Sequence, residues 1–392
     1  MKAGLFLVAL SFYIQSILAQ ASEDTGDIIV PKNSKWLAEV DVSKVPKIEV
    51  RPVGSGVCED AKCDGTDNDK CFESCGNKAN PTDIYGCPQA HQWALTFDDG
   101  PSNYTGQLLD SLDQLGVKAT FCVMGANVKK YPEFLRRAYE SGHHIASHTY
   151  SHPHLMSLTN EEIINEMKAT EEAIRDVIGI RPTYVRPPFG EADDRVKGLM
   201  KAMGYKMLLW NVDPTDYDVY TLPDAGKKIQ NSFKAAANGI DTGLNAHEEP
   251  GFISLQHDLY KESVEQVPKV VQFLKGKGYQ FVTAAQCVND QNPHEQVAAE
   301  GRMKSQSNGT AAPEQPNKEG SSSPNLPGVD TTIQQQSNVP QPNDIPPQTA
   351  PKEPIGNHKE NTLPSSGANT LTAISYLPYA ALFASFFYNI LN

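Results

Sequence analysis

The stretch Ala94-Leu95-Thr96-Phe97-Asp98-Asp99-Gly100-Pro101 decides the fold and carries the first sign of chemistry. Its apolar run predicts a buried strand, and Gly100-Pro101 predicts the turn that ends the strand. Two adjacent carboxylates at the end of a buried strand are costly, because like charges resist ionising together. By itself the stretch fits a solvated turn as well as it fits a metal ligand beside a proton-accepting carboxylate. The rest of the chain has to decide between the two.

Strand and helix patterns alternate from residue 91 to about residue 288. The expected strands are apolar runs at Trp93–Phe97, Ala119–Met124, His144–Ser147, Tyr184–Arg186, Met207–Val212, Phe252–Leu255 and Tyr279–Thr283. The expected helices are Thr105–Leu115, Pro132–Ser141, Asn160–Ile178, Asp194–Met203, Leu222–Ala237 and Val264–Lys275. Thr159 and Glu162 predict a capping box at the start of the longest helix. The pattern indicates an α/β fold, and we expect a parallel sheet closed as a distorted (β/α) barrel.

Polar residues follow several of these strands. His148 and His152 come after His144–Ser147 at the spacing i, i+4, and this pair also fits two ordinary surface or core histidines. In a parallel barrel the strand ends converge on one face, which would bring the pair to the aspartates. Two imidazoles and one carboxylate form a catalytic zinc-type ligand set that leaves room for water. His-Glu-x-x-His is not present, so the metalloprotease pattern fails.

Three further strand ends carry polar groups. Arg186 precedes Pro187-Pro188-Phe189-Gly190, Asp213 and Asp216 follow Val212, and His257 follows Leu255-Gln256. Each is a weak signal by itself, since an arginine can cap a strand and an aspartate can start a turn. Together they place an acid, a base, metal ligands and a guanidinium on one rim.

Segment 91–288 resembles the polysaccharide deacetylases of carbohydrate esterase family 4, the NodB homology domain. The matching motifs occur in order: Thr96-Phe97-Asp98-Asp99, His148-x-x-x-His152, Arg186-x-Pro188-Phe189, Asp213-x-x-Asp216 and Leu255-x-His257. Together with the amino-terminal, cysteine and carboxyl-terminal features below, the chain looks most like fungal chitin deacetylases. One position departs from the family pattern, because Tyr217 stands where the fourth motif usually has Trp. The departure puts fine specificity in question.

The resemblance implies a role for each matched residue. Asp99, His148 and His152 would hold one divalent metal, zinc or else cobalt. Asp98 would be the general base, oriented by Arg186, and His257 would be the general acid. The resemblance also implies that Asp213 pairs with His257 and that the backbone N–H of Phe189 helps to hold the oxyanion. The substrate-binding residues that it implies are Pro188, Phe189, Trp210, Tyr217 and Leu255.

The seven cysteines are expected to be mostly paired, because the chain starts like a secreted protein. We predict a long-range Cys87–Cys287 bridge and a free, buried Cys122. Two local bridges are predicted within the set Cys58, Cys63, Cys71 and Cys75, without a fixed connectivity. The Cys-rich segment 58–90 is expected to cover the barrel, and the alternative is a small chitin-binding module.

The ends of the chain carry targeting signals. Residues 1–21 predict a signal peptide, with a membrane anchor as the alternative reading, and residues 22–57 an irregular polar arm. Residues 289–366 are rich in Pro, Gln, Asn and Ser, and predict a disordered spacer. Residues 367–392 predict a glycosylphosphatidylinositol (GPI) attachment propeptide rather than a transmembrane tail, with Ser366 as the attachment site, or else Ser365 or Gly367. Asn103 and Asn308 begin glycosylation sequons.

These features predict a metal-dependent deacetylase of chitin at the fungal cell surface, with chitosan and acetate as products. The expected location is the outer face of the plasma membrane, the cell wall, or both. The alternatives are another acetylated polymer, xylan or peptidoglycan, and a catalytically silent chitin-binding wall protein. The net charge of -13 argues against nucleic-acid binding, and we expect a monomer that reaches the membrane only through its lipid.

Overall fold

A computed structural model describes residues 28–62, 66–240 and 249–297 of the chain. Several predictions concern residues outside these ranges: the signal peptide, the anchor segment, the spacer beyond residue 297, Cys63, Asn308, Ser365, Ser366 and Gly367. Within the described ranges, none of the helices combines the length and the apolar character that a membrane crossing requires.

A seven-stranded parallel sheet forms the centre of the molecule, as the sequence predicts. Its strands are β1 (Gln92–Asp98), β2 (Thr120–Val123), β3 (His144–Ser147), β5 (Tyr184–Val185), β6 (Lys206–Met207), β7 (Phe252–Ser254) and β8 (Gln280–Val282). The strand order is β6-β5-β3-β2-β1-β7, and β8 also pairs with β1. The central strand β1 is buried from Trp93 to Asp98, because β2 and β7 pair with its two edges and helices cover the outer face of the sheet.

The sheet curls toward closure, as a barrel-like fold requires. After β6 the chain runs back to β7, where Val212 forms a parallel bridge with Ser254. Leu255 donates its backbone N–H to the carbonyl of Val212 over 2.9 Å. The contact joins the two ends of the strand order, so the polar residues that follow the strands face one space.

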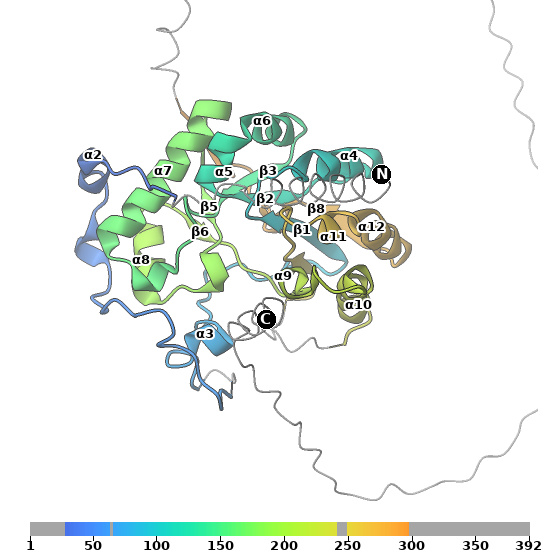
Figure 1. Ribbon diagram of the computed structural model, residues 1–392, viewed down its shortest axis with the longest axis horizontal. Coiled ribbons are helices and arrows are strands. Elements are labelled where there is room, and N and C mark those ends of the chain that lie inside the picture. Colours follow the sequence, from blue (N-terminus) through green and yellow to red (C-terminus); the bar gives the residue numbers. More distant parts are fainter. Residues whose placement is uncertain (1–27, 63–65, 241–248, 298–392) are drawn as a thin grey trace, which may run out of the picture. The chain divides into compact units, whose positions relative to one another are not determined.

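The helices lie around the outside of the sheet (Figure 1). They are α4 (Thr105–Leu115), α5 (Gly125–Lys130), α6 (Pro132–Glu140), α7 (Asn160–Ile178), α8 (Asp194–Ala202), α9 (Asp216–Val219), α10 (Ala225–Ala237), α11 (Lys261–Val264), α12 (Val267–Gly276) and α13 (Ala284–Cys287). Short 3₁₀ turns occur at η2 (Leu155–Ser157) and η3 (Pro188–Gly190). The predicted capping box of α7 is present, and left-handed Gly179 ends that helix.

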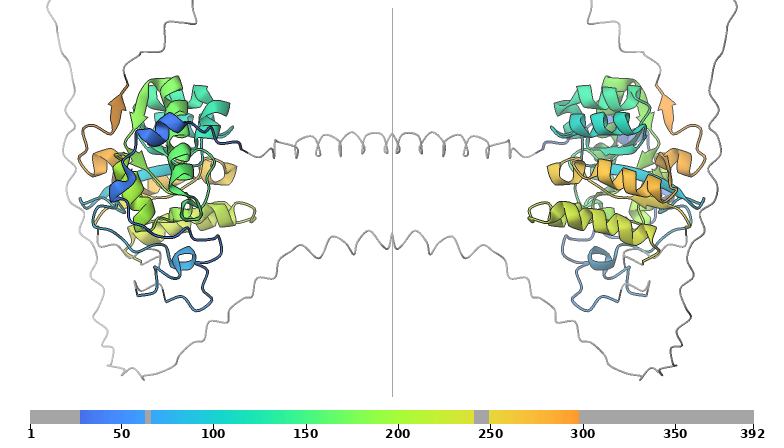
Figure 2. Two further views of the ribbon diagram at one scale, coloured as in Figure 1. Left: turned by 90° about the vertical axis from the view of Figure 1, so that its left-hand side faces the viewer. Right: turned by 90° about the vertical axis from the view of Figure 1, so that its right-hand side faces the viewer.

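The amino-terminal arm packs on the domain, although its sequence predicts only an irregular segment. It contains α2 (Ser34–Ala38) and η1 (Val42–Lys44), and Trp36 is buried in the same apolar cluster as the inner face of α7. Helix α2 contacts α7, and Figure 2 shows the blue arm lying across the green helices. The arm therefore adds core to the domain.

The Cys-rich extension also lies on the barrel, as predicted. Its helix α3 (Phe72–Cys75) buries Phe72 in the core, and the Asn77 side chain accepts a hydrogen bond from the Ala192 backbone over 2.7 Å. Cys58 is bonded to Cys71, which is one of the two expected local bridges. Cys75 is disulfide-bonded too.

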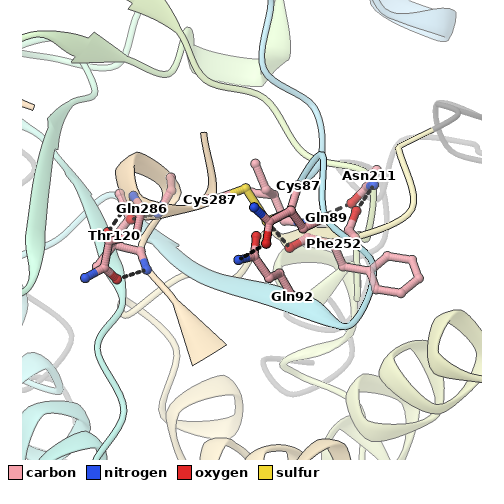
Figure 3. Close-up of a disulfide and its surroundings, with 12 residues drawn as sticks. Cys87, Gln89, Gln92, Thr120, Asn211, Phe252, Gln286 and Cys287 are labelled. Carbon is pink, nitrogen blue, oxygen red and sulfur yellow. Dashed lines mark hydrogen bonds between the residues drawn. A yellow bond between two sulfur atoms is a disulfide. The ribbon is translucent and has the colours of Figure 1, made fainter. Parts of the chain in front are cut away.

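The long-range bridge Cys87–Cys287 is confirmed (Figure 3). It joins the segment before β1 to the end of α13, across 200 residues. Cys122 is a free, buried cysteine, as expected.

The domain continues beyond residue 288, where the sequence predicts the start of the spacer. Strand β9 (His294–Gln296) pairs antiparallel with β4 (Ile180–Pro182). Asp290 accepts hydrogen bonds from Tyr184 and Lys206 over 2.7 and 2.5 Å. The composition of this segment predicted a spacer because it is polar and lacks a core of its own. The structure differs because these polar residues form hydrogen bonds with the domain.

Candidate active site

A cavity of ≈ 470 Å³ lies at the carboxyl ends of the strands. Its walls bring together most of the predicted site residues: Asp98, Asp99, His148, His152, Phe189, Trp210, Tyr217, Leu255 and His257. A hollow of ≈ 530 Å³ between the arm and the start of α7 contains none of them. The predicted site residues from Asp98 to His257, more than 150 positions apart in the sequence, therefore line the same cavity.

The turn after β1 aims two adjacent carboxylates in different directions. Asp99 has φ of 70°, a left-handed conformation that costs energy for a residue with a side chain and that is common at functional sites. Asn127 holds this turn by donating to the Asp99 backbone carbonyl over 2.6 Å. Gly100 follows because a Cβ there would lie 2.3 Å from the Asp258 carboxylate.

Asp99, His148 and His152 form a group that fits a metal ion. Asp99 Oδ1 lies 3.3 Å from His148 Nε2 and 3.4 Å from His152 Nε2, and the three ligand atoms lie within 4.8 Å of one another. Asp99 Oδ1 is buried and accepts no hydrogen bond of ordinary geometry. This carboxylate oxygen has no hydrogen-bond partner and lies close to two ring nitrogens. A divalent cation bound by these three atoms would give the oxygen the partner that it lacks.

The ring of His148 is oriented by a backbone carbonyl. His148 Nδ1 lies 2.7 Å from the backbone carbonyl of Arg186, so Nε2 is left to face Asp99. Burial alone would raise the pKa of Asp99, but His148, together with His152 and His257, outweighs burial and holds that pKa well below its ordinary value. Burial lowers the pKa of His152 to about 4, helped by the charge of His148. Asp99 and His152 are thus favoured in the states that ligate metals; burial lowers the pKa of His148, but Asp98 and Asp99 outweigh it and raise that pKa, so a metal binding there would displace a proton from His148.

Asp98 is held by the predicted arginine. Arg186 Nη1 donates to Asp98 Oδ1 over 2.7 Å, and both side chains are buried. The guanidinium also donates to Thr96 Oγ1 and to the backbone carbonyls of Leu208 and Leu209. Such a buried pair fixes one oxygen of Asp98, while the other lies 3.8 Å from His148 Nε2 at the cavity.

His257 pairs with Asp216, which corrects the expected pairing with Asp213. Asp216 Oδ1 lies 2.7 Å from His257 Nδ1, and Asp216 Oδ2 accepts the His257 backbone N–H over 2.8 Å. Burial alone would lower the pKa of His257, but the Asp216 carboxylate outweighs burial and raises it to about 9. The imidazole is therefore protonated at neutral pH.

Asp213 instead forms hydrogen bonds within the turn that leads to Asp216 and Tyr217. Its carboxylate accepts the Thr215 backbone N–H over 2.7 Å and the Tyr217 hydroxyl over 3.3 Å. Thr215 has φ of 50°, and this left-handed residue reverses the chain so that Asp216 points under His257. The Tyr217 ring lies edge-on to His257 at 5.5 Å, so its hydroxyl links Asp213 to the wall of the cavity.

The substrate-binding predictions hold for four residues as cavity-lining positions. Trp210, Leu255, Tyr217 and Phe189 line the cavity, whereas buried Pro188 does not and its neighbour Pro187 does. Phe189 takes the left-handed φ of 59°, and its side chain is exposed whereas Pro188 is buried. Besides Pro187, the cavity has six lining residues that were not among the predicted site residues: Val57, Glu73, His154, Gly190, Glu191 and Tyr260.

Comparison with known proteins gives consistent results. Residues 85–208 match the family model for polysaccharide deacetylases. Chitin deacetylase 1 of Cryptococcus neoformans is 35% identical over 289 residues, which are 70% of this chain and 60% of that protein. A peptidoglycan-N-acetylglucosamine deacetylase of Bacillus cereus is 35% identical over 209 residues, covering 52% of this chain and 73% of its own length. The solved chitin deacetylase of Colletotrichum lindemuthianum is 34% identical with a TM-score of 0.50, covering 55% of this chain and 96% of that one.

Proposed function

Because this chain belongs to the polysaccharide deacetylase family, we propose that it hydrolyses the N-acetyl groups of chitin to give chitosan and acetate. One observation carries the proposal. The Asp99–His148–His152 group lies in the same cavity as Asp98 and His257, so a cation site, a base and an acid surround one space. Metal-assisted hydrolysis of an amide uses these three functions together.

Asp99, His148 and His152 would hold one divalent metal, and zinc is the proposed ion, with cobalt as the alternative. Two imidazoles and one carboxylate leave coordination positions open. When bound, such a metal supplies a Lewis acid for the acetamide carbonyl and lowers the pKa of water.

Asp98 accepts the proton of the attacking water. Arg186 donates to Asp98 Oδ1 over 2.7 Å, so this buried ion pair fixes the position of the carboxylate at the cavity. The backbone N–H of Phe189 is the proposed additional donor to the oxyanion.

His257 donates a proton to the departing amine. Asp216 fixes the ring by its Nδ1 and keeps the imidazole charged, so Nε2 carries the proton toward the cavity. Tyr217 limits the movement of the ring from the side.

We further propose that the protein is secreted and held at the cell surface by a GPI lipid. The supporting features are the apolar start of the chain and its uncharged, apolar end after small residues. Release of the protein from cells by a phosphatidylinositol-specific phospholipase tests this, and mature protein that retains its tail peptides contradicts it.

The polymer is tested directly by acetate release. Purified, metal-loaded protein is incubated with defined chitin oligomers, acetylated xylan and peptidoglycan, and the products are followed by time-resolved mass spectrometry. We expect loss of acetyl groups from the chitin oligomers. Faster release from peptidoglycan, on which the Bacillus relative is named to act, would favour that polymer. Tight chitin binding with no acetate from any polymer would favour a silent wall protein.

A further inference from the structure

One end of the active-site cavity carries acidic and aromatic side chains that the proposed reaction does not use. Glu73 comes from α3 of the Cys-rich extension, His154 follows the metal-site histidines, and Phe189 and Glu191 come from the loop after β5. All four line the cavity that contains Asp98 and Asp99. They are therefore available to the same bound chain.

The aromatic part forms a platform that starts at the metal-ligand group. The rings of Phe189 and His154 stack at 3.9 Å and 7° between planes, and the ring of Phe189 also lies 4.6 Å from that of His152. Phe189 is 52% exposed although it lines a cavity. An exposed aromatic face beside a reaction centre offers an apolar surface to the C–H face of a sugar. The sugar on this face would be a neighbour of the one that reacts.

The acidic part consists of Glu191, which contacts His154, and Glu73. Glu191 Oε2 is 2.9 Å from His154 Nδ1, while Glu191 is only 4% exposed. The carboxylate of Glu73 accepts the backbone N–H groups of Gly54 and Gly56 over 3.0 and 2.9 Å. Among the described residues, no Lys or Arg forms an ion pair with either glutamate. This wall therefore places two carboxylates, against one imidazole, along the cavity.

A neutral chain of N-acetylglucosamine has no group that matches these carboxylates, whereas a glucosamine unit carries an ammonium. We propose that the platform of Phe189 and His154, with Glu73 and Glu191, binds a glucosamine unit next to the sugar being deacetylated. The inference rests on the proposed deacetylase function and adds its substrate class, a partly deacetylated chain. Each reaction would create the preferred neighbour for the next one, so acetyl groups would be lost in runs.

The test compares two chitin tetramers, one fully acetylated and one with a single free amine at a defined position. We expect a higher kcat/KM on the tetramer with the amine, at one position of the amine only. Glu73→Gln and Glu191→Gln should each reduce this preference about two- to fivefold, as expected for partly screened charge pairs. Glu133→Gln, an equal charge change on exposed α6, should leave the preference unchanged. The preference of the unaltered protein should also shrink as salt is raised.

Binding provides a readout that needs neither activity nor a variant. Calorimetry should show tighter, salt-sensitive binding of the glucosamine tetramer than of the N-acetylglucosamine tetramer. Equal affinity for the two tetramers, or equal kcat/KM in the unaltered protein, contradicts the glucosamine site and leaves the deacetylase intact. Absence of acetate release from both tetramers contradicts the deacetylase, and the binding comparison still decides the site.

Discussion

The carboxylate of Asp216 forms two hydrogen bonds with His257, one with the ring Nδ1 at 2.7 Å and one with the backbone N–H at 2.8 Å. Ser263 donates to the same carboxylate over 2.5 Å, so Asp216 is fully enclosed. Burial lowers the pKa of His257, and this contact is the largest of the effects that raise it, ahead of those of Asp99 and Asp98. The first prediction follows from it.

Asp216→Asn should lower the pKa of His257, because burial then acts without the opposing charge. A general acid must be protonated, so the alkaline limb of the pH–rate profile should move to lower pH, and kcat should fall by about 10²-fold or more. Asp213→Asn is the matched control, since Asp213 makes no hydrogen bond with His257 among the described contacts. A larger shift of the limb in Asp213→Asn than in Asp216→Asn would restore the pairing that the sequence suggested.

Asp98→Asn and Asp99→Asn should separate proton transfer from metal binding. Asp98→Asn should reduce acetate release by about 10²- to 10⁴-fold, because an amide is not a base at neutral pH. Zinc affinity should persist in this variant, since Asp98 is not part of the metal group. Asp99→Asn should weaken zinc binding, measured by competition with a chelator. Full activity in Asp98→Asn would defeat the proposed mechanism.

Metal removal should destabilise the fold. A ligand that binds only the native state adds about 2.7 kcal/mol at a hundredfold excess over its Kd, which corresponds to roughly 5–10 °C in Tm. Treatment with a chelator should lower the Tm by this amount, and zinc or cobalt should restore it. In Asp99→Asn the same treatment should have little effect. An unchanged Tm in the unaltered protein would argue against a metal at this group.

Gly100→Ala should disturb the turn that carries the two aspartates. The new Cβ would lie 2.3 Å from the Asp258 carboxylate, which is fully buried and already bonded to Thr105. Overpacking of this kind costs about 1–3 kcal/mol of unfolding free energy, and zinc affinity should fall with it. Gly276→Ala is the control, because nothing lies within 4 Å of its Cβ position at the end of α12. Equal effects of the two changes on denaturant unfolding would rule out this role for Gly100.

Acid should destabilise the protein through His144. Burial lowers the pKa of His144 to about 3, so the native state stays neutral while the unfolded state takes up a proton below about pH 6.5. Unfolding free energy should therefore fall as pH drops from about 6 to 4, by up to about 1.4 kcal/mol per unit for this residue. His144→Asn should make that slope shallower in urea titrations at successive pH values. Parallel slopes for the two proteins would assign the acid sensitivity to other groups.

Local signals in the sequence were sufficient for much of the fold. Helices α4 and α7 begin and end at the predicted residues, because Gly116 and Gly179 end them and Thr159 caps the second. Where tertiary packing competes with these local signals, the ends of the helices differ from the predicted ones. The predicted helix Val264–Lys275 corresponds to α12, which begins later, at Val267, with Pro268 in its first turn, and Val264 instead ends the short α11.

The site was predictable where strand ends determine it. Asp98, Asp99 and His148 follow parallel strands whose ends must converge, so their neighbourhood follows from order alone. The choice between Asp213 and Asp216 depended on a left-handed turn at Thr215, which no local signal indicates. The position of Glu73 in the cavity could not be predicted, because Glu73 belongs to a disulfide-linked segment outside the barrel.

The bond between Cys87 and Cys287 turns the intervening 200 residues into a covalent ring. A protease that nicks one exposed loop inside the ring would leave both fragments attached, with the site halves still joined. Only a cut beyond residue 287 would shed the carboxyl-terminal part of the chain. If the protein is secreted and anchored as proposed, a cut inside the ring and a cut beyond it would have separate effects, which gels run with and without reductant distinguish.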